Sequence, residues 1–137
     1  MSGYSGTPLP KKLGIKPGLR VHLANAPADI RCELGDSLAG CTPAKQSDEI
    51  DFSMFFTKSR AELAKEFPRL SRLLAPAGML WISWPKKSSG ASSDLTENDV
   101  RNIGLQAGLV DVKVCAVTNV WSGLKFVRRI KDRKSRT

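Results

Sequence analysis

The stretch IDFSMFFTKSRAELAKEFPRLSRLLAPAGMLWISW, residues 50–84, predicts a strand, a helix and a second strand in direct succession. Its two ends, Ile50–Phe56 and Met79–Trp84, are dominated by apolar residues, and the first is apolar on both faces by its end. Strands of this kind are buried between two layers, as in a parallel sheet. The stretch therefore favours an α/β fold with helices on both faces of the sheet.

The expected helix between these strands has a defined start and a defined stop. Ser59 and Glu62 have the S-x-x-E spacing of a capping box, which satisfies backbone N–H groups that have no partner inside the helix. Apolar residues follow at helical spacing, at Leu63, Phe67, Leu70 and Leu74. Pro68 falls inside this pattern and predicts a kink or a restart of the helix. We expect the helix to stop at Ala75–Gly78.

Outward from this unit, strands and helices keep alternating. Residues 19–24 predict a strand, 28–38 a short helix cut at Gly35, and 41–48 a polar, irregular segment. Thr96, with Asp99, caps the next helix, and Gly108 suits its left-handed end. Residues 110–114 and 124–127 predict the last two strands. This order predicts a three-layer, Rossmann-like α/β core with a mostly parallel sheet and a C-terminal antiparallel hairpin.

The composition indicates one globular domain with basic ends. The net charge is +9; residues 1–20 and 128–137 are basic, while 21–127 are balanced. We expect an extended arm over 1–18, one α/β domain over 19–127 and a disordered basic tail over 128–137. No apolar run is long enough to span a membrane, and no signal peptide is visible, so we expect a cytoplasmic protein with reduced cysteines. With one histidine and no CxxC pair, we expect no metal site.

Two resemblances follow from these segments. The layout, and Ser71–Trp84 and Gln106–Val127 in particular, resembles the C-terminal two-thirds of class I S-adenosylmethionine-dependent methyltransferases. Several segments also resemble a family of small, mainly actinobacterial proteins that is known only as a domain of unknown function: Tyr4–Gly18, Asn25–Pro27, Phe56–Leu63, Trp84–Glu97 and Val114–Arg129. This family implies a single-domain cytoplasmic protein and no particular reaction.

The turn after the first expected strand argues against the methyltransferase cofactor. Such folds use a glycine-rich turn there, because the backbone has to approach the ligand closely. Here the strand runs into Asn25-Ala26-Pro27, and no glycine lies between Leu23 and Gly35. We therefore expect no cofactor, and keep an enzyme with a degenerate cofactor loop as an alternative.

Cationic loops at the expected strand ends suggest a different ligand. In open α/β sheets, ligands lie at the carboxyl ends of the strands, beside helix N-termini. The candidate anion-binding residues are Asn25, Lys58, Arg60, Lys86, Lys87, Ser88 and Trp121, with Lys11 and Lys12 from the arm. The alternative is that the lysines are solvated loop residues and that Trp121 only packs on the sheet.

No set of residues indicates catalysis. Cys115 lies in an apolar strand and suits an inert core position, and His22 has no serine or cysteine partner that spacing predicts. The leading prediction is therefore a non-catalytic domain that binds an anionic partner, either a phosphate-bearing small molecule or a nucleic acid. A methyltransferase-like enzyme and a scaffold that binds another protein are the alternatives.

Overall fold

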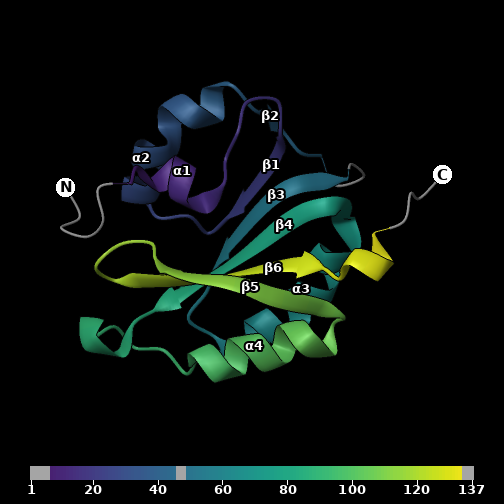
Figure 1. Ribbon diagram of the computed structural model, residues 1–137. Helices are drawn as coiled ribbons and strands as arrows, with labels where there is room; N and C mark the ends of the chain where they lie inside the picture. Colours follow the sequence, from purple (N-terminus) through teal and green to yellow (C-terminus); the bar gives the residue numbers. More distant parts are fainter. Residues whose placement is uncertain (1–6, 46–48, 134–137) are drawn as a thin grey trace.

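The computed structural model describes residues 7–45 and 49–133, which form a central sheet with helices on both faces (Figure 1). In chain order the elements are α1 (Leu9–Leu13), β1 (Arg20–Ala24), α2 (Ala28–Ala39), β2 (Thr42–Pro43), β3 (Ile50–Phe56), α3 (Arg60–Leu73), β4 (Leu74–Pro85), the 3-10 turn η1 (Lys87–Ser89), α4 (Glu97–Gln106), β5 (Leu109–Ala116), β6 (Trp121–Arg128) and the 3-10 turn η2 (Ile130–Asp132). In the described ranges no helix is long and apolar enough to cross a membrane.

The sheet confirms the predicted topology. Its strand order is β2-β1-β3-β4-β6-β5. The first four strands are parallel, and β6 runs antiparallel to both β4 and β5. The last two strands therefore form the expected C-terminal hairpin, inserted so that its second strand lies beside β4.

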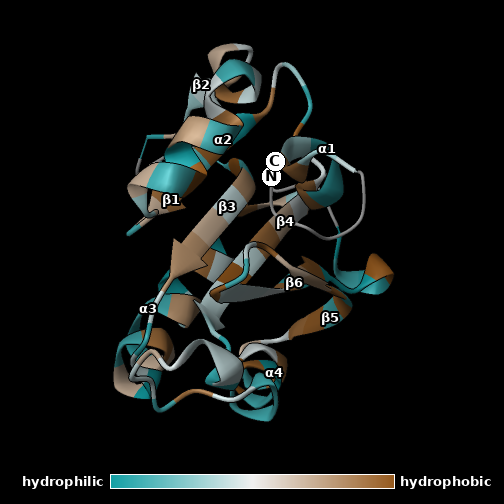
Figure 2. Ribbon diagram, turned by 90° about the vertical axis from the view of Figure 1, so that its left-hand side faces the viewer, coloured by the Kyte–Doolittle hydropathy of each residue, from teal (hydrophilic) through white to brown (hydrophobic). Residues whose placement is uncertain are grey.

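Two apolar cores lie on opposite faces of the sheet. Figure 2 shows the hydrophobic central strands between the two helical layers. One core joins α1 and α2 to Phe52, Met54 and Trp81. The other joins α3 and α4 to Phe55 and Leu80. Alternate residues of β3 thus enter different cores, which explains why this strand is apolar on both faces.

The helix caps agree with the sequence in part. Thr96 and Asp99 form a complete capping box at α4, and Gly108 has a φ of 93° after it. At α3 the Ser59 side chain accepts a hydrogen bond from the Glu62 backbone, but the Glu62 carboxylate binds Thr57 instead of reaching back to the Ser59 backbone. The helix continues through Pro68 as a single element.

Several segments differ from the sequence prediction. Helix α2 is not cut at Gly35, whose position is exposed and open. The turn expected at Ala75–Gly78 is already part of β4, and a Cβ at Gly78 would lie 2.6 Å from the backbone oxygen of Ile50. Glycine therefore permits the close approach of β3 and β4 at the irregular start of their pairing.

Both ends of the expected domain carry regular structure in their described parts. The segment expected to be an extended arm contains helix α1, whose Leu9 and Leu13 are buried in the core. The indole Nε1 of Trp81 donates a 2.9 Å hydrogen bond to the Leu13 carbonyl group. Arg128, placed in the tail by the sequence, ends β6, and its guanidinium donates to the carbonyl groups of Ser71 and Leu74. Residues 134–137 of the expected tail lie outside the described ranges.

Candidate functional site

The connections of the sheet diverge between β1 and β3. From β1 the chain passes through α2 to β2 on one side, and from β3 it passes through α3 to β4 on the other side and across the opposite face. In open α/β sheets this divergence leaves a crevice at the carboxyl ends of the two strands, where ligands bind. The residues at that point are Ala24, the last of β1, with Asn25 and Ala26 after it, and Phe56, the last of β3, with Thr57 and Lys58 after it.

The turn after β1 lies at this point of divergence and contacts the end of β3. Asn25 has a φ of 60°, a left-handed conformation that asparagine tolerates better than most residues. Its side-chain Nδ2 donates a 3.1 Å hydrogen bond to the Phe56 carbonyl group at the end of β3. Alanines at 24, 26 and 28 surround the turn, and Pro27 offers no N–H group. The turn is therefore tight and small in volume although it contains no glycine.

The loop after β3 is bound to the loop before α4. Asp94 accepts a 2.7 Å hydrogen bond from the Arg60 backbone, and the Asp94 backbone donates to the Lys58 carbonyl group. The Arg60 guanidinium lies 3.9 Å from Asp99 and is 64% exposed, so this ion pair contributes little. Lys58 is exposed. These two predicted residues therefore lie on the α3–α4 side of the strand ends.

Three of the other predicted residues, Trp121, Lys86 and Lys12, lie at the hairpin. The Trp121 ring meets the Phe56 ring edge-on, with centroids 5.2 Å apart. The Lys86 backbone donates to the Val120 carbonyl group, and the Lys12 ammonium donates to the Ala116 carbonyl group at the end of β5. Lys11, Lys87 and Ser88 are exposed. Asn25 and Trp121 thus converge on Phe56, whereas the charged residues are divided between two sides of the sheet edge.

Sequence reasoning missed a histidine–serine pair. Nδ1 of His22 lies 3.1 Å from Oγ of Ser53, and the two residues are register partners in β1 and β3. Ser53 is fully buried, and burial of the imidazole, with the nearby charge of Arg69, lowers the pKa of His22. Strand register alone brings these residues together, so chain spacing could not reveal the pair. His22 lies two residues and Ser53 three residues before the end of its strand, so the pair is set back from the strand ends.

The Cys115 thiol is half-buried, and burial raises its pKa. This makes it a poor nucleophile. In the described ranges no group of three or more histidine, cysteine, aspartate or glutamate side chains is placed to hold a metal ion.

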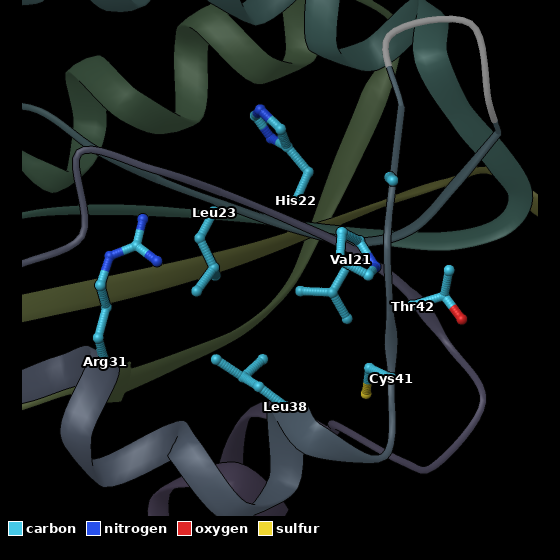
Figure 3. A pocket seen from close by; sticks show the side chains of 9 residues that line it. Val21, His22, Leu23, Arg31, Leu38, Cys41 and Thr42 are labelled. Atoms are coloured by element: carbon cyan, nitrogen blue, oxygen red, sulfur yellow. The ribbon is translucent and has the colours of Figure 1, made fainter.

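A pocket of about 300 Å³ lies beside β1, on the side of α2 and β2. Figure 3 shows Val21 and Leu23 pointing toward Leu38 of α2, with Arg31 at one side, while His22 points to the other face of β1. The pocket is mostly apolar and adjoins the crevice through Leu23, the neighbour of Ala24. An elongated ligand over the end of β1 would therefore meet polar groups in the crevice and apolar groups in the pocket.

The fold is that of the class I methyltransferases. A SAM-dependent methyltransferase from Aquifex aeolicus matches with a TM-score of 0.56 and 15% identity, over 85% of both chains. Magnesium protoporphyrin IX methyltransferase from Synechocystis PCC 6803, solved with bound SAM, matches with a TM-score of 0.56 and 14% identity, over 88% of this chain and 74% of that chain. The fibrillarin pre-rRNA processing protein from Methanococcus jannaschii matches with a TM-score of 0.53 and 12% identity, over 93% of this chain and 71% of that chain.

No protein-family model and no curated protein matches this sequence. The structural matches nevertheless correct two predictions. The leading prediction of a non-catalytic domain that binds an anion is wrong, and so is the preference for a protein that is not an enzyme, because the similar structures are methyltransferases and include complexes with SAM and SAH. The fold of these structures agrees better with the alternative, an enzyme of the methyltransferase type with a degenerate cofactor loop. The turn after β1 contains no glycine, as the sequence shows, and Asn25 adopts a positive φ there.

Proposed function

We propose that this protein is a SAM-dependent methyltransferase-like enzyme that binds its cofactor over the carboxyl end of β1. The observation that carries the proposal is the turn at Asn25. It follows β1 directly, has a positive φ and faces the end of β3, at the point where this fold places its ligands. The similarity to methyltransferase structures supports the same function.

The residues present fit such a cofactor. Methyl side chains at Ala24 and Ala26 leave the turn accessible to a ligand, and the Asn25 amide and the Phe56 carbonyl group supply polar contacts. The apolar wall of the neighbouring pocket suits the less polar part of an elongated molecule. When bound, SAM supplies an electrophilic methyl group. The chain's own contribution is to orient the cofactor at the turn, while the Phe56–Trp121 ring contact packs the end of β3 beside it.

Isothermal titration with SAM and with SAH tests the proposal. We expect saturable binding in the micromolar range, and backbone amide shifts in NMR spectra at the turn residues and at Thr57. Absence of binding at millimolar cofactor contradicts the proposed function. Binding with amide shifts confined to α4 or β5 contradicts the proposed position.

Helix α2 offers a matched pair of variants. Ala28 and Ala39 are its first and last residues, both are exposed, and about 16 Å of helix separates them. Ala28→Phe places a ring beside the turn, and we expect it to weaken cofactor binding at least tenfold. Ala39→Phe makes the same change at the far end and should leave the affinity unchanged. Equal affinities of the two variants would place the cofactor elsewhere.

Two finer predictions belong to this proposal. We place the enzyme in the cytoplasm, which the free thiols of Cys32, Cys41 and Cys115 support. We also retain the resemblance to the mainly actinobacterial family, which adds no reaction of its own.

A further inference from the structure

Lysines collect on one face of the β5–β6 hairpin. Helix α4 packs against the other face of these strands. The face that points toward α1 carries Lys113 and Lys125, and the electrostatic neighbours of this face are Lys12, Lys16 and Lys86. We call these five residues the lysine surface. No ion pair between described residues includes Lys16, Lys86, Lys113 or Lys125.

A β-bulge creates this surface. Asp111 lies opposite Phe126 in the register, and its carboxylate binds Arg101 of α4. Two residues later, in a regular strand, Lys113 would point to the same face. The register shifts at Val112, so Lys113 lies opposite Lys125 instead. The bulge thus re-aims the lysine from the α4 face to the α1 face, as bulges do near functional sites.

The resulting arrangement is costly without a ligand. Like charges directly opposite each other on neighbouring strands destabilise a sheet. Lys125 is also partly buried, and this burial, together with the charges of Lys113 and Lys16, lowers its pKa. Contacts to backbone oxygens hold two of the ammonium groups there: Lys12 donates to the Ala116 carbonyl group, and Lys113 donates to that of Lys12. A polyanion would relieve the repulsion.

The lysine surface leads to the proposed cofactor crevice. Trp121 and Lys125 lie on the same face of β6, four residues or about 13 Å apart. The Trp121 ring is partly exposed and contacts Phe56 at the end of β3. A row of cations that ends at an accessible tryptophan is the arrangement that single-stranded nucleic acids bind, with phosphates on the cations and a base stacked on the ring. An acidic protein could bind the lysines through its carboxylates, but it has no base to stack on Trp121.

We propose that the lysine surface and Trp121 bind a single-stranded nucleic acid as the substrate of this enzyme and lead it toward the crevice. This inference rests on the proposed methyltransferase function only in calling the bound strand a substrate. Binding itself is independent of the cofactor, so the two proposals fail separately. The sequence suggested Lys12, Lys86 and Trp121 of this site, whereas Lys58, Arg60 and Lys87 are not part of it.

Fluorescence anisotropy with labelled 20-nucleotide RNA and DNA strands, and with the matching duplexes, tests the proposal. Each phosphate contact to a single strand contributes a slope of about −0.7 in log affinity against log salt, or roughly a fivefold gain at 0.1 M salt relative to 1 M. The double variant Lys113→Gln/Lys125→Gln should therefore bind about 25-fold more weakly at 0.1 M salt, with a slope shallower by about 1.4. Trp121→Leu should weaken binding with no change in slope.

The control is Lys65→Gln/Lys131→Gln, which removes two exposed charges elsewhere, one of them on α3. It should retain the affinity and the slope. SAM binding should be unchanged in both double variants, and the Lys113→Gln/Lys125→Gln protein should melt no lower than wild type because a repulsion is removed. The proposal is overturned if no strand binds at 20 mM salt, if both double variants bind equally, or if a polyglutamate peptide binds more tightly than either strand. The RNA and DNA arms identify the kind of strand.

Discussion

Two helical glycines allow one substitution to be tested with opposite expected results. Gly35 lies in α2 and Gly104 in α4. A Cβ added at Gly35 would have no heavy atom within 4 Å. At Gly104 the Cβ would lie 2.1, 2.6 and 2.7 Å from three atoms of the Phe126 ring, well below the 3.4 Å at which ordinary contact begins.

The Phe126 ring has little room to move. It is fully buried, and it meets the Phe67 ring edge-on with centroids 5.1 Å apart. Overpacking of a core costs about 1–3 kcal/mol, while replacing glycine by alanine in a helix gains up to about 1 kcal/mol. Because the overlap at Gly104 is large, we expect Gly104→Ala to lower the free energy of unfolding by about 2 kcal/mol. Gly35→Ala should raise it by about 0.5–1 kcal/mol.

Urea denaturation followed by far-ultraviolet circular dichroism measures both changes, and the slope with denaturant checks that the unfolded surface is comparable. At this chain length the expected shifts in melting temperature are about −6 to −10 °C for Gly104→Ala and about +2 to +4 °C for Gly35→Ala. Adding Phe126→Leu to Gly104→Ala should recover part of the loss, since the two sites are in contact. The reasoning is refuted if Gly104→Ala is as stable as wild type, or if Gly35→Ala is the less stable of the two.

Three further predictions concern single side chains. Trp81→Phe removes the hydrogen bond to the Leu13 carbonyl group and should lower the free energy of unfolding by about 1–3 kcal/mol. Amide hydrogen exchange should become faster first in α1. Unchanged exchange there would show that the bond does not hold the helix. The fold lowers the pKa of His22, so the unfolded chain binds the imidazole proton more readily than the folded chain does. The contribution of His22 to the free energy of unfolding should be complete above about pH 6.5 and fall as pH drops through the folded-state pKa. Melting curves from pH 7.5 to 5.5 should show this loss in wild type and not in His22→Gln. Cys32 is exposed, whereas burial raises the pKa of the Cys115 thiol. Iodoacetamide at pH 7.5 should therefore modify Cys32 before Cys115, as followed by mass spectrometry. Faster labelling of Cys115 would contradict the described burial.

Local patterns in the sequence were sufficient for most of the architecture. The apolar runs Ile50–Phe56 and Met79–Trp84 predicted the buried parallel strands, and the Thr96–Asp99 spacing predicted a cap that forms as expected. These features depend on residues close together in the chain. The continuation of α2 through Gly35 could not be predicted, because neighbouring elements and not helix propensity stabilise that helix.

The candidate site depended more on packing. Asn25 and Trp121 were both singled out from the sequence, but nothing in their spacing shows that each contacts Phe56. Residue types alone did not reveal the backbone angle after β1, where Asn25 adopts the left-handed conformation that glycine usually supplies.

The sequence by itself determined the alternation of strands and helices, the parallel character of the central sheet and the positions of the helix starts. Strand register and the bulge at Val112 decided the rest, because a shift of one residue moves a side chain to the opposite face of a sheet. Only the tertiary structure therefore placed His22 beside Ser53 and Lys113 beside Lys125.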